Sequence, residues 1–372
     1  MNICTILIII GTRPEAIKLC PIILELYKHK QFNPIIVCTG QHDSMVKTVL
    51  SLFNIEPTIW LDMNSIQFQP QSKPNSLSTL TSQILINMMG IISTYKPEFI
   101  MVQGDTTSAY TSALSGFYTN VPIIHIEAGL RSYNMSQPYP EEFNRVSISL
   151  IASFHFTTTS IAMNNLSKEN ICKEKCFNVG NTIVDSYQYI IQNYYNGYVD
   201  KEKLILITCH RRENWDEPLI KLCKSIKFLC ESYPNYDFVF CSHPNPLVSN
   251  IVTNELDSTT CTILNSVPYD EFLGYVLKAK IIITDSGGIQ EEACISGTPT
   301  LVYRHVTERP EGLDTCLKLI GNDTSMLQDE IKKLIDDEDY YNKMNIPLKC
   351  YGNGDASQKI VSILSQYMNK IC

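Results

Sequence analysis

The stretch Ile281–Gly297, IIITDSGGIQEEACISG, decides the fold prediction. Four apolar or β-branched residues run directly into the turn Asp285–Gly288, and a helical pattern follows. A buried strand, a flexible turn and a helix start together form a place where backbone N–H groups can bind an anion. Two adjacent glutamates, Glu291 and Glu292, follow in the helix, although carboxylates are not expected to bind an anion.

Strand patterns and helical patterns alternate from one end of the chain to the other. The strand patterns are continuous apolar runs, which are typical of parallel strands covered on both faces. We expect strands at Thr5–Ile10, Ile35–Cys38, Phe99–Val102, Ile123–Ile126, Phe154–Thr157, Leu204–Thr208, Phe238–Cys241, Ile281–Thr284 and Thr300–Tyr303. We expect helices at Glu15–Lys30, Leu77–Tyr95, Ser108–Tyr118, Pro218–Ser232 and Tyr269–Ala279. This order predicts an α/β fold with doubly wound sheets.

The length of 372 residues is sufficient for two domains. The alternation pauses in the polar, Tyr- and Asn-rich stretch Asn165–Asp200 and then resumes. We therefore predict Rossmann-like domains at residues 1–175 and 176–354, with a C-terminal helix in residues 355–372 that packs back on the N-terminal domain. The polar stretch Asp62–Ser76 is predicted to be a mobile surface loop.

The composition indicates a globular protein, with 44% hydrophobic and 18% charged residues and no apolar run of the length that predicts a transmembrane helix. The apolar start lacks the basic region and cleavage site of a signal peptide and is predicted to be the first core strand. A formal net charge of −8 argues against general nucleic-acid binding. The 14 cysteines include no Cys-x-x-Cys pair, so we expect reduced thiols in a cytoplasmic protein and no metal site.

Several cations follow predicted strands, which is where ligands bind in open α/β sheets. Arg13 and Lys18, in GTRPEAIK, are either solvated cations at a capped helix start or contacts for an anion. His243 follows another strand beside prolines and is either a packed loop residue or part of a site. The other cations at strand ends are His210, Arg211 and Arg212 in HRREN and Arg309 in TERPEG. Such a set supplies the local positive field that an anionic ligand needs in an acidic protein.

Three carboxylates, like these cations, lie near the ends of predicted strands or at the start of a predicted helix. Asp105, in VQGDTTSA, is either the N-cap of the next helix or a functional group. Glu127 alternates with His125 in HIEAGLRS, so both should point to one face, and its alternative role is a salt bridge to Arg131. Glu141, in PYPEEFNR, opens a helix, where acidic residues are also common. Carboxylates at strand ends suit acid–base chemistry on a bound ligand.

The glycine turn in TDSGG offers backbone donors to a phosphate from Ser286, Gly287 and Gly288. Glu292 lies one helical turn further on, where a carboxylate can accept both hydroxyls of a ribose. A nucleotide diphosphate therefore fits this half of the chain. Glu291 points about a hundred degrees away around the helix and is left without a functional role.

Taken together, these motifs resemble those of the non-hydrolysing UDP-N-acetylglucosamine 2-epimerases of bacteria. The matching runs stand in family order over nearly the full length: GTRPEAIK, TGQH, GDTTSA, HIEAGLRS, PYPEEFNR, VGNTIVD, HRREN, TDSGGIQEEA and TERPEG. The resemblance implies two Rossmann-like domains in the GT-B arrangement, with an active-site cleft between them. It also implies interconversion of UDP-N-acetylglucosamine and UDP-N-acetylmannosamine by anti elimination of UDP, a 2-acetamidoglucal intermediate and re-addition of UDP, without a cofactor.

The resemblance further implies roles for individual residues. Proton transfer falls to Asp105, Glu127 and Glu141, with acid and base left open, and His210 becomes an active-site histidine near the diphosphate. The candidate substrate-binding residues are Arg13, Lys18, Arg211, His243, Ser286, Gly287, Gly288, Glu292 and Arg309. Many bacterial members bind substrate as an activator through a Gln-His loop, here Gln41 and His42, and an arginine in the segment that follows. The corresponding segment here has no arginine, which puts such activation in doubt.

The sequence is also compatible with other functions. The eight residues between Arg131 and Pro140 favour the N-acetylglucosamine branch over relatives that epimerise 6-deoxy or diacetamido-uronic UDP sugars. A GT-B glycosyltransferase would need an acceptor site and typically one base, a UDP-sugar sensor has no need of acid–base groups, and a hydrolytic variant would release free N-acetylmannosamine. The resemblance also implies a homodimer packed through the first domain, with neither a membrane nor a nucleic acid as partner.

Overall fold

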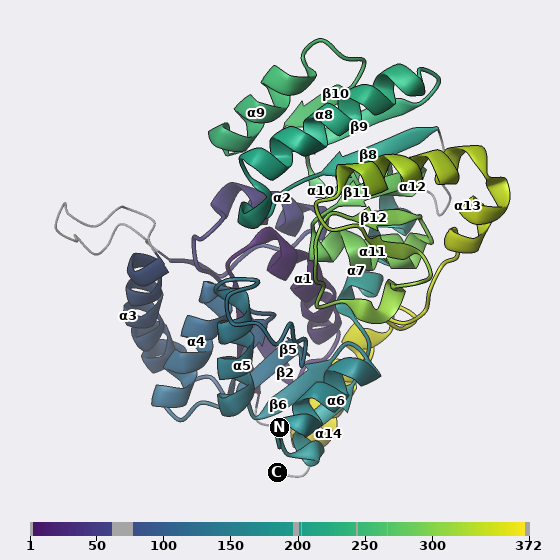
Figure 1. Cartoon of the computed structure of the whole chain (residues 1–372). Helices are drawn as coiled ribbons and strands as arrows, with labels where there is room; N and C mark the ends of the chain where they lie inside the picture. The colour runs from purple at the N-terminus through teal and green to yellow at the C-terminus, as the bar shows by residue number, and fades with distance from the viewer. Residues whose placement is uncertain are drawn as a thin grey trace. The chain divides into compact units, whose positions relative to one another are not determined.

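The computed structural model describes residues 3–61, 77–195, 201, 203–242, 245–265 and 267–368. The chain forms two compact units, Met1–Gln188 with Tyr351–Cys372, and Tyr189–Cys350 (Figure 1). Each unit contains one parallel sheet with helices between successive strands. The predicted α/β fold with two doubly wound, Rossmann-like sheets is confirmed.

The first unit is built on a sheet in the order β3-β2-β1-β4-β5-β6-β7, whose neighbouring strands all run parallel. Its strands are β1 (Cys4–Ile10), β2 (Phe32–Cys38), β3 (Ile59–Trp60), β4 (Phe99–Gln103), β5 (Ile123–Ala128), β6 (Phe154–Thr157) and β7 (Cys176–Asn178). The strand order reverses between β1 and β4, and such a reversal opens a crevice at the carboxyl ends of the strands.

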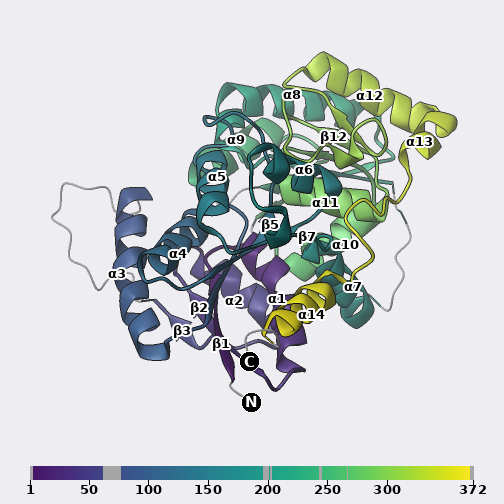
Figure 2. The ribbon, with the colours of Figure 1, turned by 90° about the horizontal axis from the view of Figure 1, so that it is seen from below.

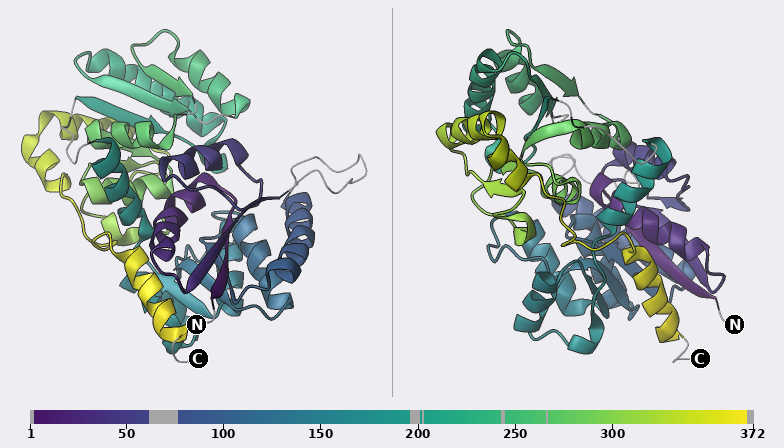
Figure 3. Two further views of the ribbon diagram at one scale, coloured as in Figure 1. Left: turned by 180° about the vertical axis from the view of Figure 1, so that it is seen from behind. Right: turned by 90° about the vertical axis from the view of Figure 1, so that its right-hand side faces the viewer.

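Helices cover this first sheet. They are α1 (Arg13–Tyr27), α2 (Asp43–Leu52), α3 (Leu77–Tyr95), α4 (Thr107–Tyr118), α5 (Glu141–Ile151), α6 (Ser160–Lys168) and α14 (Ala356–Met368), with a short 3₁₀ helix η1 (Lys173–Lys175). Helices α3, α4 and α5 form one layer (Figures 1 and 2), and their apolar residues pack on Leu7 and Ile9 of β1. Helix α14 lies alongside α1 (Figure 3). Asp185 caps the start of α14 by accepting the backbone N–H of Ser357 at 2.9 Å.

The second unit is built on a parallel sheet in the order β10-β9-β8-β11-β12-β13. Its strands are β8 (Leu204–Thr208), β9 (Asp237–Ser242), β10 (Thr262–Asn265), β11 (Ala279–Thr284), β12 (Thr300–Val302) and β13 (Leu317–Leu319). Its helices are α8 (Glu217–Ser232), α9 (Pro246–Leu256), α10 (Tyr269–Lys278), α11 (Gly287–Ser296), α12 (Thr324–Asp336) and α13 (Glu338–Met344), with 3₁₀ helices η2 (Arg212–Asn214) and η3 (Pro310–Gly312). Helices α8, α9 and α12 share one apolar core with the sheet.

The predicted strands and helices are present, and their bounds differ from the observed ones by at most three residues. The predicted pause at Asn165–Asp200 is wrong, because β7 and α7 (Thr182–Tyr194) continue the alternation there. The compact units divide after Gln188, within α7 and later than the predicted boundary after residue 175. The predicted loop Asp62–Ser76 lies outside the described residues.

None of the helices in the described part of the chain has the length and apolar character needed to cross a bilayer.

Candidate active site

The turn after β1 is held by Glu15, a fully buried residue of α1. Its Oε2 accepts the backbone N–H of Gly11 at 3.0 Å and of Thr12 at 2.6 Å, and its Oε1 accepts the hydroxyl of Thr106 at 2.6 Å. Burial raises the pKa of Glu15 to about 7, while these hydrogen bonds act in the opposite direction. Glu15 therefore ties the turn that carries Arg13 to the turn after β4.

Glycine is required at Gly11 by close packing in the same turn. A Cβ atom there would lie 2.2 Å from the hydroxyl oxygen of Ser108. That hydroxyl also contacts Thr39 Oγ1 at 2.7 Å and donates to Gln41 Oε1 at 2.7 Å. Of the two candidate effector residues, Gln41 is thus bound to the first helical turn of α4, and His42 is exposed at the start of α2.

Glu127 lies at the end of β5 and pairs with Lys18 of α1. Both side chains are buried, with exposed fractions of 5% for Glu127 and 4% for Lys18. The register of β5 against β6 shifts between Ile126 and Ala128, and Glu127 has a φ of 65°. Lys18 was predicted to contact an anionic ligand, and in the structure it is paired with the Glu127 carboxylate. The alternative partner for Glu127, Arg131, instead binds Glu169 through two hydrogen bonds of 2.6 Å.

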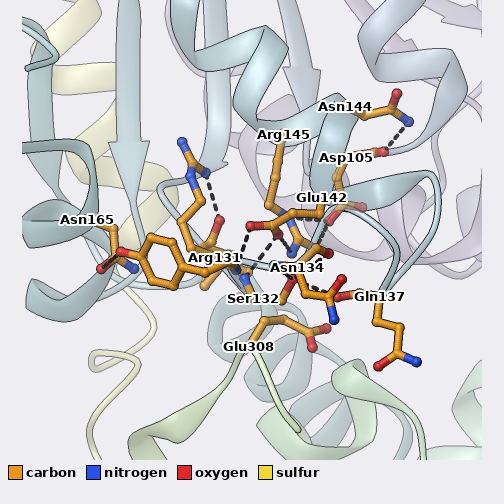
Figure 4. Close-up of polar contacts among 12 residues, drawn as sticks. Asp105, Arg131, Ser132, Asn134, Gln137, Glu142, Asn144, Arg145, Asn165 and Glu308 are labelled. Carbon is orange, nitrogen blue, oxygen red and sulfur yellow. Dashed lines mark hydrogen bonds and ion pairs between the residues drawn. The ribbon is translucent and has the colours of Figure 1, made fainter. Parts of the chain in front are cut away.

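Asp105 follows β4 and is paired with Arg145 of α5 (Figure 4). Arg145 donates from Nε to Asp105 Oδ2 at 3.0 Å and from Nη1 to Glu142 Oε2 at 2.7 Å. The alternative role of Asp105 as an N-cap is wrong, because the hydroxyl of Thr106 accepts the helix N–H of Ala109 at 3.0 Å. Asp105 retains an exposed side-chain fraction of 18%.

The two glutamates that open α5 have different environments. Glu142 is buried and accepts the backbone N–H of Ser132 at 3.0 Å and of Tyr133 at 2.9 Å, which anchors the loop before the helix (Figure 4). Glu141 is half-buried. Glu142 is thus occupied by the loop and by Arg145.

His125 lies two residues before Glu127, and both reach the turn after β4. The Nε2–H of His125 donates to the carbonyl oxygen of Gly104 at 2.8 Å, and Glu127 Oε1 lies 3.6 Å from the Cβ position of Gly104. Burial lowers the pKa of His125 to about 3, so the imidazole is neutral at physiological pH. The first unit thus gathers Asp105, Glu127 and Lys18 at the carboxyl ends of the neighbouring strands β4 and β5.

In the second unit, the turn after β8 is fixed by Asp285, which is fully buried at the end of β11. Asp285 Oδ1 accepts the backbone N–H of His210 at 2.8 Å. Its Oδ2 accepts the backbone N–H of Arg211 at 2.9 Å and the side-chain amide of Asn214 at 2.9 Å. Asp285 was not among the predicted site residues, although it determines where the predicted His210 and Arg211 lie.

Helix α11 starts with the glycine turn of the second unit. Ser286 is its N-cap residue, and a left-handed Gly297 (φ 69°) ends the helix. A Cβ atom at Gly288 would have no atom of the described residues within 4 Å, whereas one at Gly287 would lie 2.4 Å from Arg309 Nη1. The space beside Gly288 leaves the N–H groups of the first helical turn open to an approaching anion.

The adjacent glutamates of α11 have separate contacts. Glu291 is buried, and its Oε1 accepts Arg309 Nε at 2.7 Å. Glu292 is also buried, and its Oε1 accepts the hydroxyl of Tyr269 at 2.9 Å. Glu291, which had no role from the sequence, therefore orients one of the predicted substrate contacts. His243 lies outside the described residues.

No group of three or more His, Cys, Asp or Glu side chains in the described ranges has the geometry of a metal site.

Comparison with known proteins identifies the family. A family model described as UDP-N-acetylglucosamine 2-epimerase matches residues 24–365. The UDP-N-acetylglucosamine 2-epimerase of Campylobacter jejuni is 38% identical over 98% of this chain and 98% of its own. That of Neisseria meningitidis serogroup A is 38% identical over 96% of this chain and 98% of its own.

Solved structures agree with these matches. The crystal structure of UDP-GlcNAc 2-epimerase from Neisseria meningitidis bound to UDP-GlcNAc has a TM-score of 0.89 and 37% identity, covering 97% of this chain and 100% of that one. The Methanocaldococcus jannaschii UDP-GlcNAc 2-epimerase in complex with UDP-GlcNAc and UDP has a TM-score of 0.84 and 33% identity, covering 97% of this chain and 99% of that one. These likenesses confirm the GT-B-like class of fold. With a family model over most of the chain and relatives matched over nearly their full length, the chain belongs to the UDP-N-acetylglucosamine 2-epimerase family and is an enzyme of the isomerase class.

Proposed function

We propose that the protein interconverts UDP-N-acetylglucosamine and UDP-N-acetylmannosamine at carbon 2 of the sugar. Family membership supports this substrate, as does the crystal structure of the Neisseria meningitidis relative bound to UDP-GlcNAc. The observation that carries the proposal is the pair of carboxylates Asp105 and Glu127 at neighbouring strand ends, each paired with one cation. Carboxylates at these positions suit the removal and delivery of a proton.

The proposed reaction begins with removal of the proton on carbon 2 by one carboxylate. The electron pair of that C–H bond forms the double bond between carbons 1 and 2. The bond from carbon 1 to oxygen breaks, and UDP leaves with the electron pair of that C–O bond. The product is 2-acetamidoglucal. A proton is then added to carbon 2 on the opposite face, and UDP adds back to carbon 1. Elimination and addition balance each other, so the overall reaction needs no oxidant or reductant.

The second unit would supply the contacts to UDP. The N–H groups at the start of α11 and the guanidinium of Arg309 suit the diphosphate, and Glu292 suits the ribose hydroxyls. Positive groups at the diphosphate stabilise the negative charge that develops as UDP departs, which lowers the barrier to elimination. Asp105, Glu127 and Glu141 would share the proton transfers, with the order of acid and base unassigned.

Incubation of UDP-N-acetylglucosamine with the protein in deuterated water, followed by proton NMR, tests the proposal. We expect loss of the carbon-2 proton signal and the appearance of UDP-N-acetylmannosamine. Free N-acetylmannosamine would indicate hydrolysis instead, and turnover of only another UDP-acetamido sugar would change the assigned substrate. Folded protein that binds UDP but exchanges no proton would refute the proposal.

The variant Asp105→Asn sharpens this test, because Arg145 keeps Glu142 as a partner when Asp105 loses its charge. We expect the exchange rate to fall by about a hundredfold or more, while UDP affinity changes little. Glu169→Gln is the matched control, since it also removes a carboxylate from a pair with a buried arginine of the first unit. The control should retain exchange, and equal losses in both variants would point to a structural role for Asp105.

We also propose a homodimer formed through the first unit. Helices α3, α4 and α5 expose large apolar side chains at Ile86, Met89, Phe117, Tyr118 and Leu150. Leu150 is 72% exposed, so Leu150→Asp should leave the fold intact while dissociating the dimer. Sedimentation velocity measures the oligomeric state of both proteins. A wild-type protein that is monomeric at micromolar concentration would exclude this dimer.

A cytoplasmic location is proposed as well, because the cysteines of the described residues are free thiols, as expected in a reducing compartment.

A further inference from the structure

A single buried carboxylate in the second unit is surrounded by three arginines. Glu308 lies between β12 and η3 and has an exposed fraction of 3%. Its Oε1 lies 3.3 Å from Arg211 Nη2, and its Oε2 lies 2.9 Å from Arg304 Nη2. Arg309 Nη1 also donates to Glu308 Oε1. We call Arg211, Arg304 and Arg309 the arginine cluster.

The arginine cluster is costly to assemble. Among these side chains and Glu291, three positive charges face two negative ones. Arg304 and Arg309 are each only 7% exposed, so water screens their mutual repulsion poorly. Burial lowers the pKa of Arg304, and the charges of Arg211 and Arg309 lower it further, with Glu308 acting in the opposite direction. Like charges gathered in this way need a reason outside the stability of the fold.

Arg304 shows a second sign of an incomplete environment. Its Nη2 binds Glu308, but its buried Nη1 has no hydrogen-bond partner among the described residues. A buried guanidinium donor without an acceptor is expensive, and such groups occur where an anionic ligand completes the environment.

The arginine cluster borders the start of α11. Arg309 Nη1 lies 2.4 Å from the Cβ position of Gly287, in the first turn of that helix. Arg211 belongs to the turn that Asp285, at the end of β11, holds through its backbone N–H. The cluster thus extends the positive charge of the helix start, where the proposed function puts the diphosphate.

We propose that Glu308 is a positioning residue that holds the arginine cluster in the orientation that receives the diphosphate of the UDP sugar. This inference rests on the proposed function, since it takes UDP as the ligand. Glu308 does not itself contact the substrate. It offsets the repulsion among the arginines and fixes the directions of their N–H groups, so that fewer side chains must be ordered when UDP binds.

The proposal predicts that UDP affinity falls when Glu308 loses its charge, whereas electrostatics alone predicts that it rises. Glu308→Gln removes a negative charge beside the diphosphate site, so electrostatics alone would strengthen UDP binding. Loss of positioning acts in the opposite direction, because the arginines separate and the N–H groups of Arg211 and Arg309 lose their common acceptor, Glu308 Oε1. We expect the second effect to dominate and UDP affinity to fall at least about tenfold, or about 1.4 kcal/mol.

Isothermal titration of UDP into the full-length protein tests this. Glu308→Asp keeps the charge on a shorter side chain and should bind UDP with intermediate affinity, which also decides the matter if Glu308→Gln does not fold. Glu330→Gln is the matched control, because Glu330 is an equally buried glutamate of the same unit, paired with Lys318 and Lys333. The control should lose stability but keep wild-type UDP affinity. Steady-state kinetics should show the Glu308 variants losing more in KM than in kcat.

The possible failures are distinguishable. A wild-type protein that does not bind UDP would overturn the proposed function and this inference with it. A wild-type protein that binds UDP, together with Glu308→Gln and Glu308→Asp variants that bind it equally well or more tightly, would overturn the inference alone.

Discussion

Asp285 offers the sharpest test of how the second unit positions its site. Its hydrogen-bond donors are divided between the two carboxylate oxygens: His210 N–H on Oδ1, and Arg211 N–H, the Asn214 amide and, more weakly, the Cys209 thiol on Oδ2. In Asp285→Asn one of these oxygens becomes an NH₂ group. Whichever way the new side chain turns, a buried donor then faces another donor.

The loss of stability in Asp285→Asn follows from the number of buried donors that are left without an acceptor. With the asparagine oxygen toward Arg211 and Asn214, the backbone N–H of His210 and one N–H of the new amide are both left without an acceptor. Each such buried donor costs about 1–3 kcal/mol, and the charge assistance of the other bonds is also lost. We therefore expect the free energy of unfolding to fall by about 3 kcal/mol. UDP affinity should fall as well, because His210 and Arg211 lose the group that fixes their backbone.

Asp323→Asn is the control for this reasoning. Asp323 caps α12 in solvent and also accepts two backbone N–H groups, from Ser325 at 2.9 Å and Met326 at 3.0 Å, but both reach Oδ1. An asparagine oxygen can replace Oδ1 there while its NH₂ group faces water, and asparagine caps helices about as well as aspartate. Urea unfolding should show a change within about 0.5 kcal/mol. A similar loss in both variants, or none in Asp285→Asn, would refute the argument from divided donors.

Two further predictions concern protonation and the glycine turn. Burial holds the folded pKa of His125 at about 3, below its unfolded value of about 6.5, so its contribution to stability is complete above pH 6.5 and is lost as the pH falls toward 3. The difference in unfolding free energy between wild type and His125→Gln should therefore change by about 1.4 kcal/mol per pH unit across that range, and urea unfolding that finds a constant difference would contradict the assignment. Gly288→Ala should keep the stability of the fold but weaken UDP binding, since a Cβ there meets no described atom within 4 Å and enters the space left for the anion. Gly287→Ala should instead destabilise the protein, because its Cβ would lie 2.4 Å from Arg309 Nη1, and identical thermal unfolding of the two variants would show that this contact does not matter.

The central strands could be predicted from the sequence, and the edge strands could not. The strands Phe154–Thr157 and Leu204–Thr208 were predicted with their observed bounds. The strands that the sequence did not reveal are β3, β7, β10 and β13, which are the edges of the two described sheets. Edge strands are covered less completely, and these are short, such as the two-residue β3 and the strand Thr262–Asn265, none of whose residues is buried. An apolar run is a sign of burial on both faces, and these strands do not have it.

The residues that hold the site were hidden for a different reason. Motif reading found groups that could face a ligand, such as Asp105 and Arg309, because these groups lie at strand ends. It passed over Glu15, which forms a capping box with Thr12 in the local pattern T-x-x-E, and whose further bond to Thr106 spans 91 residues. It also did not find Asp285, whose partner His210 lies 75 residues away in the sequence. A carboxylate that accepts backbone N–H groups from a distant turn leaves no local pattern. The one available signal was position, since Asp285 directly follows a buried strand.

Glu291 of α11 and Glu308 illustrate how carboxylates can serve the proposed diphosphate site. Glu291 holds the Nε of Arg309, and Glu308 holds the same guanidinium through Nη1. An arginine bound on two sides by carboxylates has a fixed plane, and its remaining N–H groups point in a fixed direction. The carboxylates reduce the positive charge available to a phosphate, but they also remove the freedom that the arginine would otherwise lose on binding. In the proposed reaction the site binds a diphosphate and then stabilises its departure within one catalytic cycle, and for such a site fixed direction matters more than maximal charge.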